Sequence, residues 1–168
     1  MNTLQRCLDM LDRYKIFHVH TSHANAYRAR EVAEAEHLPA YMLAKTVIVR
    51  GPYGYAMAVL PADCKVDLDE LAEAVNLHSV RLATEEEVRE RFPDSEIGAF
   101  PPFGPLFGLP VYMDTRLADE TYIFFNAGTH RDAIHMSVAD YVRLADPVVT
   151  QFAYPDKLMP TPSALARS

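Results

Sequence analysis

Glu96-Ile97-Gly98-Ala99-Phe100-Pro101-Pro102-Phe103-Gly104-Pro105 is the stretch around which the rest of this chain is organised. Glycine permits backbone angles and close approaches that other residues cannot adopt, and proline fixes its own φ and removes an N–H donor. A segment this rich in both cannot be a helix or an inner strand. Its phenylalanines also argue against a linker in solvent. We therefore expect a shaped loop that presents backbone N–H groups to a pocket walled by apolar rings.

The composition is that of a globular domain with a real core. The chain has 168 residues, of which 49% are hydrophobic and 23% are charged, and this size favours one domain. No apolar run is long enough for a membrane span and the N-terminus lacks a signal pattern, so we expect a cytoplasmic protein with no membrane partner. Cys7 and Cys64 stand alone, which indicates neither a disulfide framework nor a thiolate metal site. The net charge of −7 argues against broad affinity for nucleic acid.

The basic residues are concentrated near the N-terminus. Residues 1–51 carry seven basic and five acidic side chains, a balance of +2, which leaves −9 for the remainder of the chain. Because binding to phosphate needs clustered Lys and Arg, any contact with RNA is expected to be local and on this side.

Hydrophobic periodicity and helix-start patterns predict the order of the elements. The predicted helices are 2–14, 28–37 and those begun by Asp67-x-x-Glu70, Thr84-x-x-Glu87 and Ser137-x-x-Asp140. The predicted strands are 16–21, the hairpin 46–50 and 55–60 around Gly51-Pro52-Tyr53-Gly54, then 110–114, 122–125 and 148–152. A short apolar piece, 133–136, is expected to lead into the last helix.

This order lacks the regular βαβ alternation of a doubly wound fold. It predicts an α+β single domain over 1–153, with a mixed, mainly antiparallel sheet flanked by helices. The prolines of residues 154–168 predict an extended C-terminal tail.

Two residues are candidates for chemistry beside the loop. Lys45 opens an apolar strand, so its side chain either reaches the surface, as most lysines do, or points into a cavity. In a cavity its ammonium would suit a phosphate or a polarised carbonyl. His130 lies in the turn Asn126-Ala127-Gly128-Thr129-His130 after a strand, where side chains are often functional on a rigid scaffold, although a solvent-exposed turn histidine fits equally.

His18, His20 and His23 form a candidate metal pattern. Strand residues at i and i+2 face the same way, so His18 and His20 could share an ion. No acidic or cysteine ligand lies nearby at a familiar spacing, and packing or exposure explains these histidines as well. The chain also lacks a G-x-S-x-G elbow, a Walker loop and a G-x-G-x-x-G turn, so a covalent mechanism is not indicated.

Three segments in this order resemble the YbaK/prolyl-tRNA synthetase-associated domain family of aminoacyl-tRNA deacylases. They are Ala44-Lys45-Thr46, the 98–104 loop and the 125–130 turn, and the resemblance covers residues 16 to 147. It implies a YbaK-like fold and a trans-editing enzyme that hydrolyses the ester between a mischarged amino acid and its tRNA. Water is expected to attack directly, positioned by main chain and by the tRNA's own hydroxyl.

The resemblance also implies roles for individual residues. Lys45 is expected to hold the terminal adenosine's phosphate or the substrate. Gly98 and Pro102 end a G-x-x-x-P loop whose N–H groups bind the ester carbonyl, and His130 shapes the amino-acid pocket. The expected catalytic residues are Lys45, Gly98 and His130, and the expected substrate-binding residues are Thr46, Ala99, Phe100, Pro102, Phe103, Gly104, Asn126 and Gly128.

The implied partner is the acceptor end of an aminoacyl-tRNA, with an aminoacyl-tRNA synthetase as a second candidate, and no metal or cofactor is implied. Two other interpretations stay open. One is a non-catalytic binding module for an aminoacyl-adenosine-like ligand or a protein partner. The other is a metal-dependent hydrolase that uses His18, His20 and His23.

Overall fold

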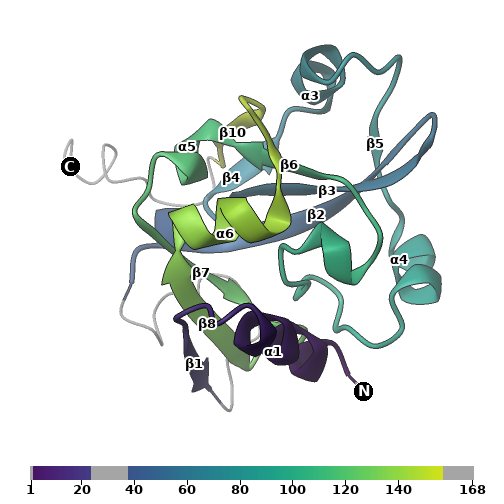
Figure 1. Ribbon diagram of the computed structural model, residues 1–168. Helices are drawn as coiled ribbons and strands as arrows, with labels where there is room; N and C mark the ends of the chain where they lie inside the picture. The colour runs from purple at the N-terminus through teal and green to yellow at the C-terminus, as the bar shows by residue number, and fades with distance from the viewer. Residues whose placement is uncertain (1, 24–37, 157–168) are drawn as a thin grey trace.

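The computed structural model describes residues 2–23 and 38–156 (Figure 1). Its helices are α1 (Thr3–Arg13), α3 (Leu68–Ala74), α4 (Glu85–Arg91), α5 (Thr115–Ala118) and α6 (Val138–Ala145), with 3-10 helices η1 (Ala40–Met42) and η2 (Gly104–Leu106). Its strands are β1 (Val19–Ser22), β2 (Ala44–Gly51), β3 (Gly54–Pro61), β4 (Cys64–Val66), β5 (Arg81–Leu82), β6 (Val111–Asp114), β7 (Tyr122–Asn126), β8 (Asp132–Ser137), β9 (Val148–Thr150) and β10 (Ala153–Pro155). The predicted helix over 28–37 lies outside the described residues.

The predicted hairpin is confirmed and forms the centre of the larger sheet. Pairing of Gly51 with Gly54 leaves Pro52 and Tyr53 as the turn between β2 and β3. The strand order is β5-β2-β3-β6-β9, with antiparallel pairs around β2 and parallel pairs on both sides of β6. A second sheet, β1-β8-β7, and the pair β10-β4 are antiparallel. The predicted α+β fold with a mixed, mainly antiparallel sheet is therefore confirmed.

The strand predicted over 16–21 begins later than expected, at Val19. The N–H of Ile16 donates to the carbonyl of Leu11 (2.9 Å), and the N–H of Lys15 donates to the carbonyl of Asp12 (3.1 Å). Lys15 has a φ of 56°, so residues 11–16 end α1 as a Schellman motif. The end of α1 therefore includes Ile16, which the sequence pattern had placed in the predicted strand.

The apolar piece over 133–136 is also more than a lead into the last helix. It is the centre of β8, the middle strand of the smaller sheet, which pairs with β1 and β7.

The three predicted helix starts are confirmed. The side chains of Asp67, Thr84 and Ser137 each accept a hydrogen bond from the backbone N–H three residues further on. At α4 the box is reciprocal, because the Glu87 carboxylate accepts from the backbone N–H of Thr84 (2.9 Å). These caps fix where α3, α4 and α6 begin.

The core lies on both faces of the β2–β3 hairpin. On one face, Ile48 and Met57 pack into a cluster with the buried sides of α1 and α6. Figure 1 shows α6 in front of the hairpin and α1 below it, beside β7 and β8. On the other face, Val49 and Leu60 pack with Phe152 and with residues of β4 and α3. None of the helices in the described ranges has the length and apolarity needed to cross a membrane.

A third apolar cluster joins the two sheets. It consists of Leu43, Ala62, Phe124 and Ala133, and an isolated parallel bridge pairs Leu43 with Phe124. This junction sets the register between the beginning of β2 and the strand β7.

The buried side chain of Asp114 fastens the end of the described chain to the sheet. Its Oδ1 accepts from the N–H of Arg116 (2.9 Å), and its Oδ2 accepts from the N–H groups of Phe152 and Ala153 (2.8 Å each). β10 follows at once and pairs with β4. Regular structure thus continues two residues past 153, where the sequence predicted the beginning of a tail, and residues 157–168 lie outside the described part.

Candidate functional site

The predicted loop and the predicted histidine turn are bound together as one unit. The N–H of Glu96 donates to the carbonyl of Gly128 (2.9 Å), and the N–H of Gly128 donates to the carbonyl of Ala99 (2.7 Å). The backbone N–H of His130 donates to the Glu96 carboxylate (3.0 Å), and the ring Nε2 lies 2.7 Å from the carbonyl oxygen of Ile97. Four hydrogen bonds therefore hold the loop against the turn between β7 and β8.

Gly98 lies at the exposed surface of this unit. Its φ of +83° belongs to the region that favours glycine, and a Cβ placed there would lie 3.4 Å from His130 Cε1. Among the described residues, the backbone N–H groups of Gly98 and Phe100 have no acceptor. The loop thus keeps main-chain donors that have no acceptor, and one of them, the Gly98 N–H, belongs to the residue that lies against the histidine ring.

The tautomer of His130 follows from its contact with the loop. Because a carbonyl oxygen can only accept, Nε2 carries the proton toward Ile97, and in the neutral ring Nδ1 is an acceptor. Within the described part of the chain the buried Nδ1 has no hydrogen-bond partner. The ring therefore offers one acceptor to a group that the protein itself does not supply.

Two of the predicted substrate-binding rings lie in the core beneath the loop. Phe100 makes an edge contact with Phe92, with ring centroids 5.3 Å apart. Phe103 is fully buried and makes edge contacts with Phe125 (5.5 Å) and Tyr141 (5.3 Å). Both rings support the loop from inside, and neither lies open to solvent.

The end of the loop is held in the same way. The hydroxyl of Tyr141 donates to the carbonyl of the buried Pro102 (2.7 Å), and burial raises the pKa of this tyrosine. A Cβ on Gly104 would lie 2.0 Å from the Leu109 carbonyl oxygen, so that glycine is needed for close packing. Pro102 and Gly104 therefore fix the shape of the loop.

Gly128 is packed against α1. Its φ is +99°, and a Cβ there would lie 2.9 Å from the Cβ of Thr3. The glycine lets the turn approach the beginning of α1, and its N–H and carbonyl hold the loop.

Lys45 and Asn126 leave their strands on the same side. Each follows the bridged pair Leu43 and Phe124 by two residues, and side chains two apart on a strand point the same way. Asn126 immediately precedes the 127–130 turn, so this register brings Lys45 to the same end of the sheet as the loop. The buried Oδ1 of Asn126 has no hydrogen-bond partner among the described residues.

The surroundings of Lys45 are half-buried and charged. Burial lowers the pKa of this lysine, and the charges of Asp156, Cys64 and Asp63 oppose that shift, while Lys65 adds to it. The Lys45 side chain is therefore neither fully exposed at the surface nor enclosed in a cavity. Part of its stem is covered, and charged groups lie around its end.

Thr46, next along β2, points to the opposite face from Lys45. It is buried, and its Oγ1 has no hydrogen-bond partner in the described ranges. Direct contacts therefore unite Gly98, Ala99, Gly128 and His130, and strand register places Lys45 with Asn126 on one side of their strands. Thr46 points to the other side, that of Ala44 and Ile48, whose cluster also contains Phe100 and Phe103.

The N-terminal histidines are engaged separately. His18 Nδ1 lies 2.8 Å from the carbonyl oxygen of Ile16, and His20 Nε2 lies 2.8 Å from the Asp132 carboxylate. In residues 2–23 and 38–156, no group of three or more His, Cys, Asp or Glu residues is placed to hold a metal ion. The buried thiols of Cys7 and Cys64 have their pKa raised to about 12, and burial is the largest cause in both.

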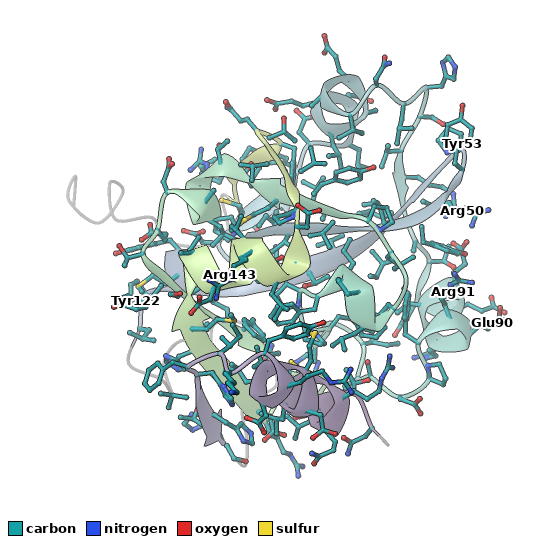
Figure 2. The ribbon with its side chains drawn as sticks, viewed as in Figure 1. Arg50, Tyr53, Glu90, Arg91, Tyr122 and Arg143 are labelled. Atoms are coloured by element: carbon teal, nitrogen blue, oxygen red, sulfur yellow. The ribbon has the colours of Figure 1, made fainter. Side chains whose placement is uncertain are left out.

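Two cavities are lined by none of the predicted site residues, although the second borders the end of the loop at Pro105. One, of about 290 Å³, is lined by Tyr53, Tyr55 and Arg91 at the turn end of the hairpin, and β2 separates it from Lys45. Figure 2 shows Arg50, Tyr53 and Arg91 gathered at that end, with Tyr122 of β7 on the opposite side of the view. The other, of about 460 Å³, lies beside α1 and η2.

Three residues with evident roles here were not singled out from the sequence. Glu96 and Tyr141 hold the loop, and Asp156 is the strongest charged neighbour of Lys45. Glu96 carried a signal, because an acid opens the loop two residues before Gly98. Tyr141 lies among apolar helix residues and Asp156 in the predicted tail, so neither carried a local pattern.

Comparison of the sequence with known proteins identifies relatives. The family model described as "Aminoacyl-tRNA editing domain" matches residues 23–144. The Escherichia coli (strain K12) protein named "Multifunctional Ser/Thr-tRNA deacylase ProXp-y" is 33% identical over 99 residues, which are 58% of this chain and 59% of that protein. A "Proline--tRNA ligase" of Fervidobacterium nodosum is 28% identical over 135 residues, 73% of this chain and 23% of the ligase. The match to the deacylase thus spans about three-fifths of its length.

Solved structures share the fold. A protein described as a candidate trans-editing enzyme for prolyl tRNA synthetase superposes with a TM-score of 0.78 at 24% identity, over 90% of this chain and 97% of that chain. A hypothetical protein of known structure superposes with a TM-score of 0.80 at 19% identity, over 89% and 99% of the two chains. At these identities the likeness concerns the fold.

Proposed function

Since this chain belongs to the aminoacyl-tRNA editing domain family, we propose that it is an aminoacyl-tRNA deacylase of the trans-editing type. The reaction is hydrolysis of the ester between a mischarged amino acid and the terminal adenosine of its tRNA, a hydrolase reaction on a carboxylic ester. The observation that carries the proposal is the loop-turn unit, in which the N–H groups of Gly98 and Phe100 have no acceptor among the described residues and Gly98 lies against the His130 ring. A deacylase relative and a ligase relative support the same substrate class.

The loop supplies stabilisation of charge. In the proposed reaction a water oxygen attacks the ester carbonyl carbon, and negative charge develops on the carbonyl oxygen. The N–H groups of Gly98 and Phe100 donate to that oxygen, because they have no acceptor among the described residues. Preorganised donors of this kind stabilise the transition state more than the ground state. The ester C–O bond then breaks, the tRNA hydroxyl oxygen receives the proton of the attacking water, and the free amino acid leaves.

The remaining groups hold the substrate. The Lys45 ammonium binds the phosphate of the terminal adenosine or the substrate itself, as a compact charge with three donors. The unpartnered acceptors Asn126 Oδ1 and His130 Nδ1 suit the α-ammonium group of the amino acid. Phe100, Phe103 and Gly104 act beneath the loop, where they fix its shape, and Ala99, Pro102 and Gly128 fasten it.

We further propose that an aminoacyl-tRNA synthetase is a partner and that the reaction takes place in the cytoplasm. The support is the ligase relative, in which the matching region makes up 23% of a synthetase chain. Such a partner would release the mischarged acceptor end directly to the loop.

A panel of correctly charged and mischarged aminoacyl-tRNAs, assayed with and without a chelator, tests this function. We expect at least one mischarged ester to be hydrolysed well above background, with no effect of the chelator. Lys45→Ala is expected to abolish that hydrolysis, whereas Lys15→Asn, which removes a lysine charge where asparagine tolerates the positive φ, should retain it.

The same panel separates the alternatives. Binding of aminoacyl-tRNA without turnover, with only affinity lost in Lys45→Ala, would favour the non-catalytic binding module. Loss of activity with the chelator, restored by a transition metal, would favour the metal-dependent hydrolase. Hydrolysis of no aminoacyl ester would refute the enzyme proposal.

A further inference from the structure

The end of the described chain returns to the beginning of β2. β10 pairs antiparallel with β4, and its last pair joins Pro155 to Cys64. The ladder is then extended by one bond, in which the N–H of Asp156 donates to the carbonyl of Asp63 (2.9 Å). Asp156 is thereby placed where β4 begins.

That point is adjacent to the first residues of β2. The N–H of Ala62, directly before Asp63, donates to the carbonyl of Leu43 (2.8 Å), and Lys45 pairs with Leu60. Backbone pairing alone thus brings Asp63 and the C-terminal strand to the edge of the sheet from which Lys45 extends.

Within residues 2–23 and 38–156, the charged groups that act on Lys45 can be named individually. Asp156 is its strongest charged neighbour, followed by Cys64 and Asp63, and Lys65 opposes them. The Cys64 thiol, with a pKa raised to about 12, is neutral near pH 7, so the anions are the two carboxylates. Asp63 is buried and accepts from the Cys64 thiol (3.6 Å), and of the two carboxylates Asp156 acts more strongly on the lysine.

Asp156 lies between two lysines in different surroundings. Its carboxylate is 4.0 Å from the Lys65 Nζ, whose side chain is 52% exposed, whereas Lys45 is half-buried. A charge pair is stronger where water is partly excluded, and an exposed pair contributes little. Asp156 therefore pairs directly with Lys65, and its charge also acts on the half-buried Lys45 from beyond ion-pair distance.

We propose that Asp156 is a positioning residue for Lys45, and that the C-terminal strand β10 is thereby part of the reaction site. The inference rests on the proposed function, in which Lys45 binds an anionic part of the aminoacyl-tRNA. A lysine has a flexible four-carbon stem and three N–H donors. The charge of the Asp156 carboxylate attracts the ammonium from one side, orients it and favours its cationic form, while the three donors stay available to the substrate. Asp114 holds β10 in place by binding the N–H groups of Phe152 and Ala153.

The test measures the charge of Lys45 directly, without any tRNA. The full chain contains four lysines, so a ¹³C-lysine NMR titration resolves each side chain, and Lys45→Arg identifies its signal. We expect Asp156→Asn to move the titration of Lys45 to lower pH. We expect Lys65→Gln to move it to higher pH, because that variant removes the opposing cation. Glu85→Gln, which removes a carboxylate paired with Arg89 on α4, is the matched control and should leave the titration unchanged.

A second arm measures deacylation by the same variants. Asp156→Asn should reduce kcat/KM on the order of tenfold through loss of positioning, and Asp156→Glu should restore part of it. Glu85→Gln should retain activity. The proposal is overturned if the Lys45 titration in Asp156→Asn matches the wild type. It is also overturned if kcat/KM of Asp156→Asn is unchanged in an active enzyme. If no variant hydrolyses any aminoacyl-tRNA, the proposed function fails, and the titration still decides whether Asp156 holds Lys45.

Discussion

Replacement of Gly98 by alanine separates the function of the loop from its stability. Gly98 and Gly108 both have positive φ, +83° and +68°, and both lie in the glycine- and proline-rich region. An L-residue in this conformation costs roughly 1–2 kcal/mol, so both alanine variants should lose about that much folding free energy. Gly108→Ala is the matched control, because nothing lies within 4 Å of its added Cβ.

The surroundings of the two positions differ at the candidate site. The Cβ of Gly98→Ala would lie 3.4 Å from His130 Cε1 and 3.8 Å from Nε2. These are ordinary contact distances, so the fold should tolerate the methyl group. The methyl group stands beside the N–H that is proposed to bind the ester oxygen, and strain at φ +83° redirects that donor. Loss of one such donor costs about 10²–10³-fold in kcat.

Urea unfolding and single-turnover deacylation of both variants measure the two effects. We expect similar losses of stability, with a reduction of at least about a hundredfold in rate for Gly98→Ala alone. If Gly98→Ala and Gly108→Ala lose activity equally, or if Gly98→Ala keeps its rate, Gly98 does not lie at the reacting ester.

Two further predictions concern buried groups. Asp114→Ala leaves the N–H groups of Phe152 and Ala153 without an acceptor, so urea denaturation should show a loss of about 2–6 kcal/mol, and a loss under about 1 kcal/mol would contradict the anchor. The thiols of Cys7 and Cys64 should react with a disulfide reagent at pH 8 only after unfolding, because their pKa is raised to about 12 in the folded chain. Since the unfolded thiols titrate near 9, their contribution to the free energy of unfolding is complete below pH 9 and is lost above it, by up to about 1.4 kcal/mol per pH unit for each thiol. Rapid reaction of the native protein, or a stability that does not fall between pH 9 and 10, would contradict that burial.

The sequence predicted those parts of the fold whose signals are local. The hairpin around 51–54 and the caps Asp67, Thr84 and Ser137 depend on residues a few positions apart, and all are confirmed. The elements β4, β5, β10 and α5 have two to four residues, too few for a periodic pattern. They exist because of pairing and capping with distant segments, as when Asp114 holds the chain that leads into β10.

The site was predictable to a similar extent. The family expected from residues 44–46, 98–104 and 125–130 is the one to which the chain belongs. Composition indicated a shaped loop. The loop is bound to the His130 turn by hydrogen bonds, and no spacing of residues in the sequence predicts those bonds. The inward direction of Phe100 and Phe103 depends on rings just after α4, in β7 and in α6, so it too could not be read from the loop itself.

The two sheets meet where the two halves of the candidate site meet. Lys45 belongs to the larger sheet, and the turn that binds the loop joins β7 and β8 of the smaller one. Among the described residues β2 and β7 share a single bridge, between Leu43 and Phe124. Within a sheet, hydrogen bonds fix spacing in steps of whole residues, whereas apolar side chains of different volume can alter a separation gradually. Substitutions that enlarge or shrink side chains in the Leu43 cluster would therefore change the distance between Lys45 and the loop-turn unit, while each of these keeps its internal geometry. Members of the family could thus diverge to accept larger or smaller substrate amino acids through substitutions at residues that never contact the substrate.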